Sequence, residues 1–413
     1  MRWWRQAWPG KSKHLAVALL IGSIAASAWA QRPVNPHAGE PIGTVEQVLD
    51  GALLPDIQVN TFRNDDRLFD NHTVKRGSRV YPLPASTKRL TNVHFKSRGH
   101  DYDLYDYVSL NRVSGLLVIK DGAIAFETYQ LGNSDKTRWV SFSVVKSMTG
   151  ALIGAAIKQG HIRSLDDPVT RYLPQLAGSG YEGTTVRNLV QMASGVKWDE
   201  TYTDPKSDLR RMLEIQKAQT PGGVLAMMTQ LPRIAAPGSR WNYNTGETQV
   251  AGALLRAAVG KPLSEYLSER IWARFGMESD ATWRLESPDG LEVGGGGLSA
   301  TLRDYGRFGL FLLQDGKVDG EQILPINWVR EAGSPKVVAG KPVDYGYLLW
   351  PIPNASGTIH EGAFEAHGIF GQHVYVNPKE NLVIVVWSAL PKPTGAATID
   401  DFDFFKVVAQ ALH

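Results

Sequence analysis

Two serine–lysine pairs, each with a spacing of three residues, carry the clearest chemistry in this chain. Ser143 and Lys146 lie within SFSVVKSMTGALIG, and Ser194 and Lys197 lie within MASGVKW. On a helix this spacing places both side chains on one face. A serine hydroxyl becomes a nucleophile when a base takes its proton, and a lysine is such a base only when burial or a nearby cation lowers its pKa. A working pair would therefore perform acyl transfer through a covalent serine intermediate.

Only the first pair is followed by residues that can form the required helix. About one or two Ser-x-x-Lys matches arise by chance in a chain of this length, so context must decide. Helix-forming residues continue from Ser143 to Gly160, and the positive end of a helix dipole favours an anionic oxygen at Ser143. Ser194 is followed by Gly195 and the loop-like WDETYTDP, so a loop after a helix is predicted there. The alternative for Ser143 is a helix cap without chemistry.

Other common hydrolase patterns are missing from the sequence. Around Ser179, Ala177 occupies the first glycine position of Gly-x-Ser-x-Gly, and no His-Glu-x-x-His occurs. The chain has no cysteine, which excludes disulfides, thiolate nucleophiles and cysteine-rich metal sites. The ten histidines are scattered, and His367 and His373 are expected to lack metal-ligating partners. The sequence therefore predicts neither a metal site nor a cofactor.

Strand-like runs near both ends, with helices between them, predict the scaffold. Residues 113–132, VSGLLVIKDGAIAFETYQLG, predict two strands joined at Asp121-Gly122, a strong hairpin signal. Strands are also expected in GQHVYVNP and NLVIVVWSAL, before a final helix in DFFKVVAQAL. Residues 187–276 are predicted to form helices joined by loops, and GGGGLSATLRDYGRFG a glycine turn and then a helix. This order indicates an α+β fold, with one sheet built from early and late segments beside a helical insertion.

The first 30 residues are typical of a secretory signal peptide. Four basic residues precede the apolar run LAVALLIGSIAASA, and Ala28-Trp29-Ala30 fits a cleavage site after Ala30. A retained membrane anchor is the alternative. Removal of residues 1–30 leaves 40 basic against 41 acidic residues, a net charge of −1, which implies no basic face for nucleic acid. We expect a periplasmic or secreted bacterial protein without membrane contact after cleavage, and an irregular extension over residues 31–91 with one short helix in TVEQVLDGALL.

Three segments resemble the serine β-lactamase and penicillin-binding superfamily in their order and separation: SFSVVKSMTGALIG, WNYNTGETQV and AHGIFGQHVYVNP. MASGVKWDETYTDPKSD and GGGGLSATLRDYGRFG narrow the resemblance to the branch related to class C β-lactamases, which includes 6-aminohexanoate-dimer hydrolases and serine esterases. The resemblance covers a catalytic domain over residues 92–413. It implies a β-lactamase/transpeptidase-like fold, an antiparallel sheet flanked by helices plus a helical lobe, with the cleft between them.

The resemblance also implies roles for individual residues. Ser143 would be the acylated nucleophile and Lys146 its activating partner. Tyr243 takes the place of the tyrosine in the family's Tyr-x-Asn motif, where it would accept the serine proton, directly or through Lys146, and donate it to the leaving group. Thr245 stands where family members usually have asparagine, and Asn244 is out of register.

A third motif of the superfamily is altered in this chain. Residues 366–368, Ala-His-Gly, replace Lys-Thr-Gly on the edge strand, so the lysine and threonine that grip a β-lactam carboxylate are missing. The backbone amides of Ser143 and Ile369 would form the oxyanion hole. Trp198 and Trp241 would either line the acyl pocket or belong to the core. The residues expected to contact substrate are Tyr202, Thr245, His367 and Gly368.

The sequence therefore predicts a serine hydrolase that cleaves a small linear amide or carboxylic ester through an acyl-enzyme at Ser143, with an aminohexanoate-dimer-like amide as the named candidate. Tyr202 matches a tyrosine that contacts the scissile nitrogen in amide-hydrolysing relatives, which favours an amide. One alternative, a β-lactamase or D-alanyl carboxypeptidase, is disfavoured by the missing Lys-Thr-Gly. Another, a non-catalytic periplasmic protein that binds peptidoglycan fragments, is disfavoured because Lys146 and Tyr243 are both present.

Overall fold

The computed structural model describes residues 35–413 of the chain. Contacts join Pro36–His413 into one compact unit. The signal peptide predicted over residues 1–30, with cleavage after Ala30, lies outside the described residues. Within the described part, every helix is too short or too polar to cross a bilayer.

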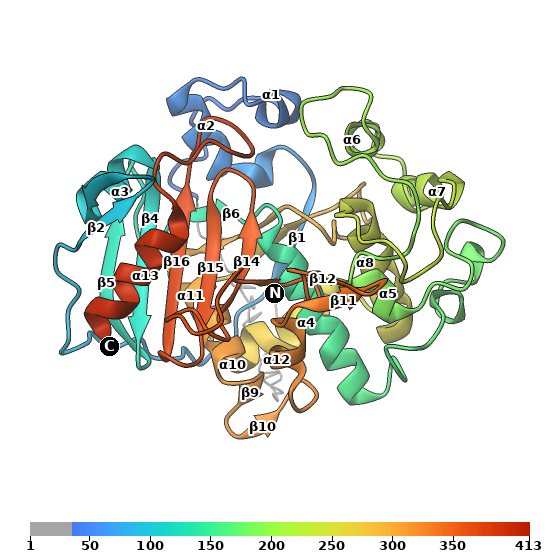
Figure 1. Cartoon of the computed structure of the whole chain (residues 1–413). Helices are drawn as coiled ribbons and strands as arrows, with labels where there is room; N and C mark the ends of the chain where they lie inside the picture. Colours follow the sequence, from blue (N-terminus) through green and yellow to red (C-terminus); the bar gives the residue numbers. More distant parts are fainter. Residues whose placement is uncertain (1–34) are drawn as a thin grey trace, which may run out of the picture. The chain divides into compact units, whose positions relative to one another are not determined.

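A six-stranded antiparallel sheet forms the scaffold, with the strand order β13-β14-β15-β16-β4-β5 (Figure 1). The predicted hairpin is confirmed as β4 and β5, and its turn residues Asp121 and Gly122 both have positive φ. The early hairpin pairs with the late strands through β4 and β16, as expected. The strands are β4 (Val113–Lys120), β5 (Ala123–Tyr129), β13 (Trp350–Pro351), β14 (Phe364–Gly368), β15 (Gln372–Asn377) and β16 (Leu382–Ser388).

Alternate side chains of this sheet enter two separate apolar cores. On β4, Leu117 and Ile119 belong to the larger core, whereas Leu116 and Val118 belong to the smaller one. Successive strand residues point to opposite faces, so a fully apolar strand can supply both cores. The larger core is shared with α4 (Val144–Gln159) and α11 (Leu302–Leu313), and the smaller one with α13 (Asp401–Leu412), which crosses the other face (Figure 1).

A helical lobe lies beside the large sheet, as the sequence predicted for residues 187–276. Its helix α8 packs against α4, α5 and α7, which links the lobe to the helix that begins after Ser143. The helices here are α5 (Val186–Val190), α6 (Asp208–Lys217), α7 (Gly223–Gln230), α8 (Thr245–Val259) and α9 (Leu263–Leu267). The short α10 (Ala273–Phe275) follows and packs on α11 through the Phe275 and Phe311 rings. Elsewhere lie α3 (Leu104–Leu110) and α12 (Trp328–Ala332).

A second sheet of four strands was not predicted. Its strand order is β1-β7-β8-β6, with β1 (Asn71–Val74), β7 (Ala281–Arg284), β8 (Leu298–Thr301) and β6 (Arg138–Val140). The expectation of a single sheet is therefore wrong. GGGGLSATLRDYGRFG also enters β8 before α11 begins, so the predicted glycine turn does not lead directly into a helix. These strands are short and pair with segments far away in sequence, so local pattern gives little warning of them.

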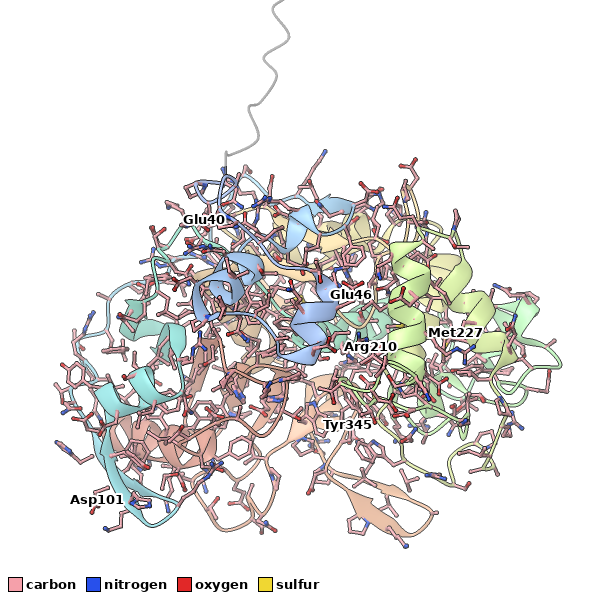
Figure 2. All side chains as sticks on the ribbon, turned by 90° about the horizontal axis from the view of Figure 1, so that it is seen from above. Glu40, Glu46, Asp101, Arg210, Met227 and Tyr345 are labelled. Carbon is pink, nitrogen blue, oxygen red and sulfur yellow. The ribbon has the colours of Figure 1, made fainter. Side chains whose placement is uncertain are left out.

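Residues 36–91 contain more regular structure than the predicted irregular extension. Helix α1 (Val45–Asp50) matches the predicted short helix, but α2 (Pro55–Phe62) and β1 were not predicted. Pro55 occupies the first turn of α2, where its missing N–H costs nothing. Glu46 and Asp50 of α1 form ion pairs with Lys217 and Arg210 of α6, which tie this segment to the helical lobe (Figure 2).

Phe62, at the end of α2, anchors the N-terminal segment in the larger core. Its side chain is 1% exposed. The centroid of its ring lies 5.6 Å from the ring centroid of Trp139, 4.9 Å from that of Phe142 and 5.1 Å from that of Phe370. Edge-to-face and tilted aromatic contacts at these separations add to the free energy gained by burial.

Phe62→Ala is expected to lower the free energy of unfolding by about 3–5 kcal/mol, because it removes a buried ring and leaves a cavity among three aromatic residues. Leu54→Ala is the matched control in the same segment, since Leu54 is 74% exposed and its truncation should change stability by less than about 0.5 kcal/mol. Urea unfolding of both variants measures the difference. Equal, small effects would mean that residues 36–91 contribute little to the fold.

Candidate active site

Ser143 and Lys146 form a direct contact at the start of α4. Ser143 occupies the N-cap position, but its side chain makes no capping hydrogen bond to the helix. Instead Lys146 Nζ lies 2.7 Å from Ser143 Oγ. The alternative of Ser143 as a simple helix cap is therefore not supported. Ser143 is half-buried and lines a cavity, so its hydroxyl is within reach of a ligand.

The Lys146 amine is enclosed by groups that come from distant parts of the chain. The residue is 2% exposed, and Nζ donates a second hydrogen bond to the carbonyl of Gly295 at 2.8 Å. The Tyr243 ring centroid lies 5.2 Å from Nζ. Burial lowers the pKa of Lys146 to about 8, although the charge of Glu200 acts to raise it. An amine with such a pKa is partly unprotonated near neutral pH.

The glycine-rich segment before β8 permits this enclosure. A Cβ atom on Gly295 would lie 2.4 Å from Thr248 Oγ1 and 3.3 Å from Lys146 Nζ. Only glycine therefore allows the carbonyl at position 295 to approach the amine. The sequence identified this segment as part of the resemblance but not as a partner of Lys146.

Tyr243 lies in the loop that leads into α8. The following residue, Asn244, caps that helix by accepting a hydrogen bond from Glu247 N. The half-buried Tyr243 ring stacks on Trp350 with a centroid distance of 5.5 Å. Burial and the charge of Glu200 raise the pKa of Tyr243 well above its usual value, against a hydrogen bond with Ser143 that lowers it. The phenol therefore keeps its proton at neutral pH and can act as a hydrogen-bond donor.

Strand β14 ends beside the nucleophile turn. A Cβ on Gly368 would lie 2.6 Å from the Ser141 carbonyl and 3.2 Å from the Ser143 amide nitrogen, so glycine allows the strand to approach this closely. Beyond Glu365, the outer edge of β14 has no partner strand among residues 35–413. Within the same residues, the amides of Ser143 and Ile369 donate to no protein acceptor. Both line the cavity at Ser143, as an oxyanion hole requires.

Strained backbone flanks both of these amides. Phe142, before Ser143, has φ 45°, and Phe370, after Ile369, has φ 65°. Such left-handed conformations cost about 1–3 kcal/mol each in bulky residues and persist where packing enforces them. Phe62 packs on both rings, which lie 5.3 Å apart. The N-terminal segment therefore supports the backbone on both sides of the candidate oxyanion hole.

Glu200 is a site residue that the sequence alone did not reveal. Its carboxylate accepts hydrogen bonds from the Thr245 amide at 3.0 Å, the Thr245 hydroxyl and the Trp198 indole. Burial raises the pKa of Glu200, and the charge of Lys146 opposes this effect. Tyr202 also interacts with Glu200, and burial raises its pKa well above the usual value. The only sequence signal for Glu200 is its place in WDETYTDP, two residues before Tyr202.

The second Ser-x-x-Lys match has a different environment. Ser194 is fully buried and its hydroxyl donates to Glu247, while Lys197 is exposed. Ser194 follows α5 in a loop, as predicted. This serine is committed to a structural hydrogen bond, so the geometry favours Ser143.

The cavity at Ser143 has an apolar wall that comes largely from segments without a predicted role. Thr245, Tyr202 and Ile369 line it, as the sequence suggested. Its lining does not include Trp198, which is buried and donates a hydrogen bond to Glu200, or Trp241, which contacts Tyr345 and Trp350. The apolar lining residues without a predicted role are Val45, Val48, Leu49, Phe62, Leu68, Phe142, Leu209, Met212, Leu213 and Val293.

His367 does not reach this cavity, although it was predicted to contact substrate. Gly368 points towards Ser143, and the preceding residue on a strand points to the opposite face. His367 lines a second cavity with His373 and Glu365, whose ligating atoms all lie within 4.8 Å of one another. The sequence did not reveal this neighbour: Glu365 places a carboxylate oxygen within reach of both histidines, so the three residues could hold a metal ion.

Comparisons with known proteins agree with this geometry. A profile of the Beta-lactamase family matches residues 111–406. The chain is 27% identical over 306 residues to the 6-aminohexanoate-dimer hydrolase of Paenarthrobacter ureafaciens, which covers 70% of this chain and 76% of that protein. A solved Bacillus anthracis protein, proposed to be a 6-aminohexanoate-dimer hydrolase, superposes with a TM-score of 0.70 at 26% identity, covering 85% of this chain and 91% of that one.

A family VIII carboxylesterase shares the fold, with a TM-score of 0.55 at 17% identity over 72% of this chain and 91% of that one. The predicted α+β fold, an antiparallel sheet flanked by helices with a helical lobe, is confirmed. The chain belongs to the Beta-lactamase family, a family of serine hydrolases.

Proposed function

We propose that this protein hydrolyses a small linear amide or carboxylic ester through an acyl-enzyme at Ser143. The observation that carries the proposal is the 2.7 Å contact between Ser143 Oγ and the enclosed amine of Lys146. A serine needs a base at this distance, and a lysine needs burial to become that base. Both conditions are met by the same pair of residues.

In the first half-reaction, Ser143 Oγ attacks the substrate carbonyl while its proton passes to the free amine of Lys146. The carbonyl oxygen becomes an oxyanion, which accepts hydrogen bonds from the amides of Ser143 and Ile369. The tetrahedral intermediate then breaks its bond to the leaving group, which takes up a proton from Tyr243 as the proton of Lys146 returns to the phenol. Water repeats these steps on the acyl-enzyme and releases the acid and Ser143.

The pKa directions divide the proton-transfer roles. Burial lowers the pKa of Lys146 to about 8 but raises the pKa of Tyr243, so the amine is the better base and the phenol the better donor. The two groups lie close enough to titrate as a coupled pair. Lys146 therefore acts as the immediate base in this proposal, and Tyr243 delivers the proton to the leaving group.

The substrate class follows from the cavity and from the relatives. The apolar wall formed by α1, α2 and α6 suits an aliphatic acyl or alkyl chain. Tyr202 lines the same cavity, where its phenol can contact a scissile nitrogen. The similarity to the Paenarthrobacter hydrolase supports an aminohexanoate-dimer-like amide as the named candidate. The predicted signal peptide supports a periplasmic or secreted location.

Fluorophosphonate labelling followed by a substrate panel tests this function. Wild-type protein should react at Ser143. Ser143→Ala should not be labelled, and its kcat/KM should be lower by about 10⁴- to 10⁶-fold. Ser194→Ala is the matched control and should still be labelled, because Ser194 donates to Glu247 instead of contacting a lysine. Labelling at Ser194, or none at all, would contradict the proposal, and the latter would favour a binding protein.

The panel contains linear amide dimers, aliphatic nitrophenyl esters and a chromogenic cephalosporin. Turnover of amides or esters with aliphatic acyl chains is expected. Turnover of the cephalosporin alone would instead support a β-lactamase, in spite of Ala366 at the position of the lysine in Lys-Thr-Gly.

The pH dependence of kcat/KM tests the role of Lys146. Activity should rise with pH through about 8, because only the unprotonated amine can accept the serine proton. Glu200→Gln should move this rise to lower pH, since the Glu200 charge raises the pKa of Lys146. Glu361→Gln, an exposed carboxylate, is the control and should leave the profile unchanged. A shift to higher pH in Glu200→Gln would rule out this electrostatic assignment.

Gly368→Ala tests the close approach of β14 to the nucleophile turn. The new Cβ would lie 2.6 Å from the Ser141 carbonyl, so the strand must move and carry the Ile369 amide away from the oxyanion. We expect kcat to fall by about 10²- to 10³-fold, the usual effect of losing one oxyanion donor. Gly39→Ala is the control, because no atom lies within 4 Å of the position its methyl group would take and its φ is negative. Unchanged kcat in Gly368→Ala would exclude Ile369 from the oxyanion hole.

A further inference from the structure

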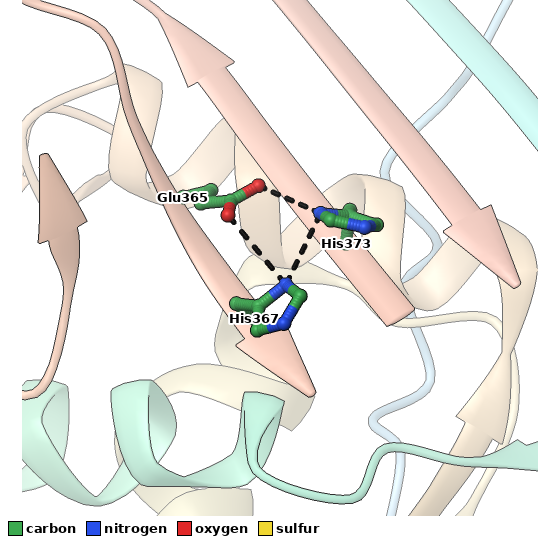
Figure 3. A group of neighbouring side chains, drawn as sticks. All are labelled: Glu365, His367 and His373. Carbon is green, nitrogen blue, oxygen red and sulfur yellow. Dashed lines mark hydrogen bonds and ion pairs between the residues drawn. The ribbon is translucent and has the colours of Figure 1, made fainter. Parts of the chain in front are cut away.

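Glu365, His367 and His373 form a compact cluster on the hairpin of β14 and β15 (Figure 3). His367 lies directly opposite His373 in the β-ladder, and Glu365 precedes His367 by two residues. Residues two apart on a strand, and residues directly opposite across a ladder, share one face of a sheet. The hairpin therefore presents all three side chains on the face covered by α13, opposite to the face that carries Gly368.

The ligating atoms of these residues converge. His373 Nδ1 lies 2.8 Å from Glu365 Oε2, and His367 Nδ1 lies 3.6 Å from Glu365 Oε1. The two Nδ1 atoms are 3.3 Å apart. A tetrahedral zinc ion with ligands at about 2.0–2.1 Å holds those ligand atoms roughly 3.3–3.4 Å from one another. The two distances to Glu365 involve different oxygens of its carboxylate, whereas one oxygen would bind the ion, so the Glu365 side chain would rotate to complete the geometry.

A network of ion pairs and hydrogen bonds is the alternative to a metal site in this cluster. A charged His373 ring can donate from Nδ1 to Glu365, while its buried Nε2 lies 3.4 Å from Asp401 Oδ2 and makes no hydrogen bond among the described residues. His367 fits this network when its ring is neutral with the proton on Nε2, because its Nδ1 then accepts from His373 Nδ1 at 3.3 Å. A cation is the other arrangement that fits, since two neutral rings can each offer it the lone pair of Nδ1.

Asp401, at the start of α13, supplies the outer partner that metal-bound histidines usually have. Its Oδ2 lies 3.4 Å from His373 Nε2, and its Oδ1 accepts a hydrogen bond from the Tyr107 hydroxyl at 2.7 Å. Such a carboxylate fixes the orientation and tautomer of the ring. With two neutral imidazoles, the carboxylates of Glu365 and Asp401 balance the charge of a divalent cation.

A cavity of about 390 Å³ adjoins the cluster and is lined by Trp350, Phe402 and Asp401 together with the three ligands. Its lining residues differ from those of the cavity at Ser143. The His367 side chain is 39% exposed, while Glu365 and His373 are buried. Two histidines and one carboxylate beside an open space are the ligand set of zinc sites that keep one exchangeable position.

We propose that Glu365, His367 and His373 bind one divalent transition-metal ion, with zinc as the best match and its fourth position open to this cavity. The chain has no cysteine, so nitrogen and oxygen atoms provide the whole ligand set. The site does not depend on the hydrolytic function proposed for Ser143. The ion would link β14 to β15 next to Gly368. It would thereby fix the end of β14, which Ile369 follows directly.

Zinc titration of the metal-free full chain, prepared without an affinity tag, tests the site. Calorimetry and elemental analysis should show one zinc ion per chain. His367→Gln should weaken the affinity by about 100-fold or more, and Asp401→Asn by about 10- to 100-fold. His161→Gln is the matched control and should bind as the wild type does, because His161 is exposed and lies outside the cluster.

Cobalt provides a second readout that is independent of activity. Wild-type protein loaded with Co²⁺ should show the visible absorption of tetrahedral coordination, and His367→Gln should lose it. Circular dichroism of the metal-free variants checks folding, and the half-exposed position of His367 makes its variant the safest. Substoichiometric zinc in the wild type, or equal affinity in His367→Gln and His161→Gln, would overturn the proposal and leave an ion-pair network.

Discussion

The enclosure of the Lys146 amine is the constraint on which the rest of the site depends. Transfer of an ammonium group out of water favours its neutral form, which lowers its pKa towards the range where a base is useful. The same enclosure demands oxygen partners for the amine, and these are the Ser143 hydroxyl and the Gly295 carbonyl. Gly295 can approach only because it has no side chain. The buried helix α4, the glycine-rich segment and the Lys146 amine are therefore parts of one arrangement.

The proposed oxyanion hole would impose a second requirement, namely that packing holds a strained backbone in place. The two amides follow and precede phenylalanines with positive φ, and Phe62 packs on both rings. Aromatic packing offsets the strain, since buried rings contribute several kcal/mol each. Residues 36–91 thus belong to the physical support of the site, and α1 also forms part of the cavity wall through Val45 and Val48.

Local features of the site were predictable from sequence, whereas features that depend on distant contacts were not. Ser143, Lys146 and helix α4 follow from spacing and helix propensity, and the β4–β5 hairpin follows from its turn. Glu200 lies in a loop without regular structure, so its contact with Thr245 depends on how that loop folds. His367 is different, because the alternation of strand residues already separates it from Gly368. Once residues 364–368 are assigned to a strand, His367 and Gly368 must face opposite sides of the sheet. Their opposite orientations could therefore be predicted from sequence as well.

Strand β14 connects the two sites proposed for this molecule. Gly368 lies against the nucleophile turn on one face, while Glu365 and His367 lie with His373 on the other. Trp350 forms a second link, since it stacks on Tyr243 and also lines the cavity beside the histidines. As a donor in the proposed oxyanion hole, the Ile369 amide would need a closely fixed position, because hydrogen bonds to an oxyanion weaken steeply with distance and angle. The proposed cation, by tying β14 to β15, would act on that position through the backbone alone, without contact with substrate.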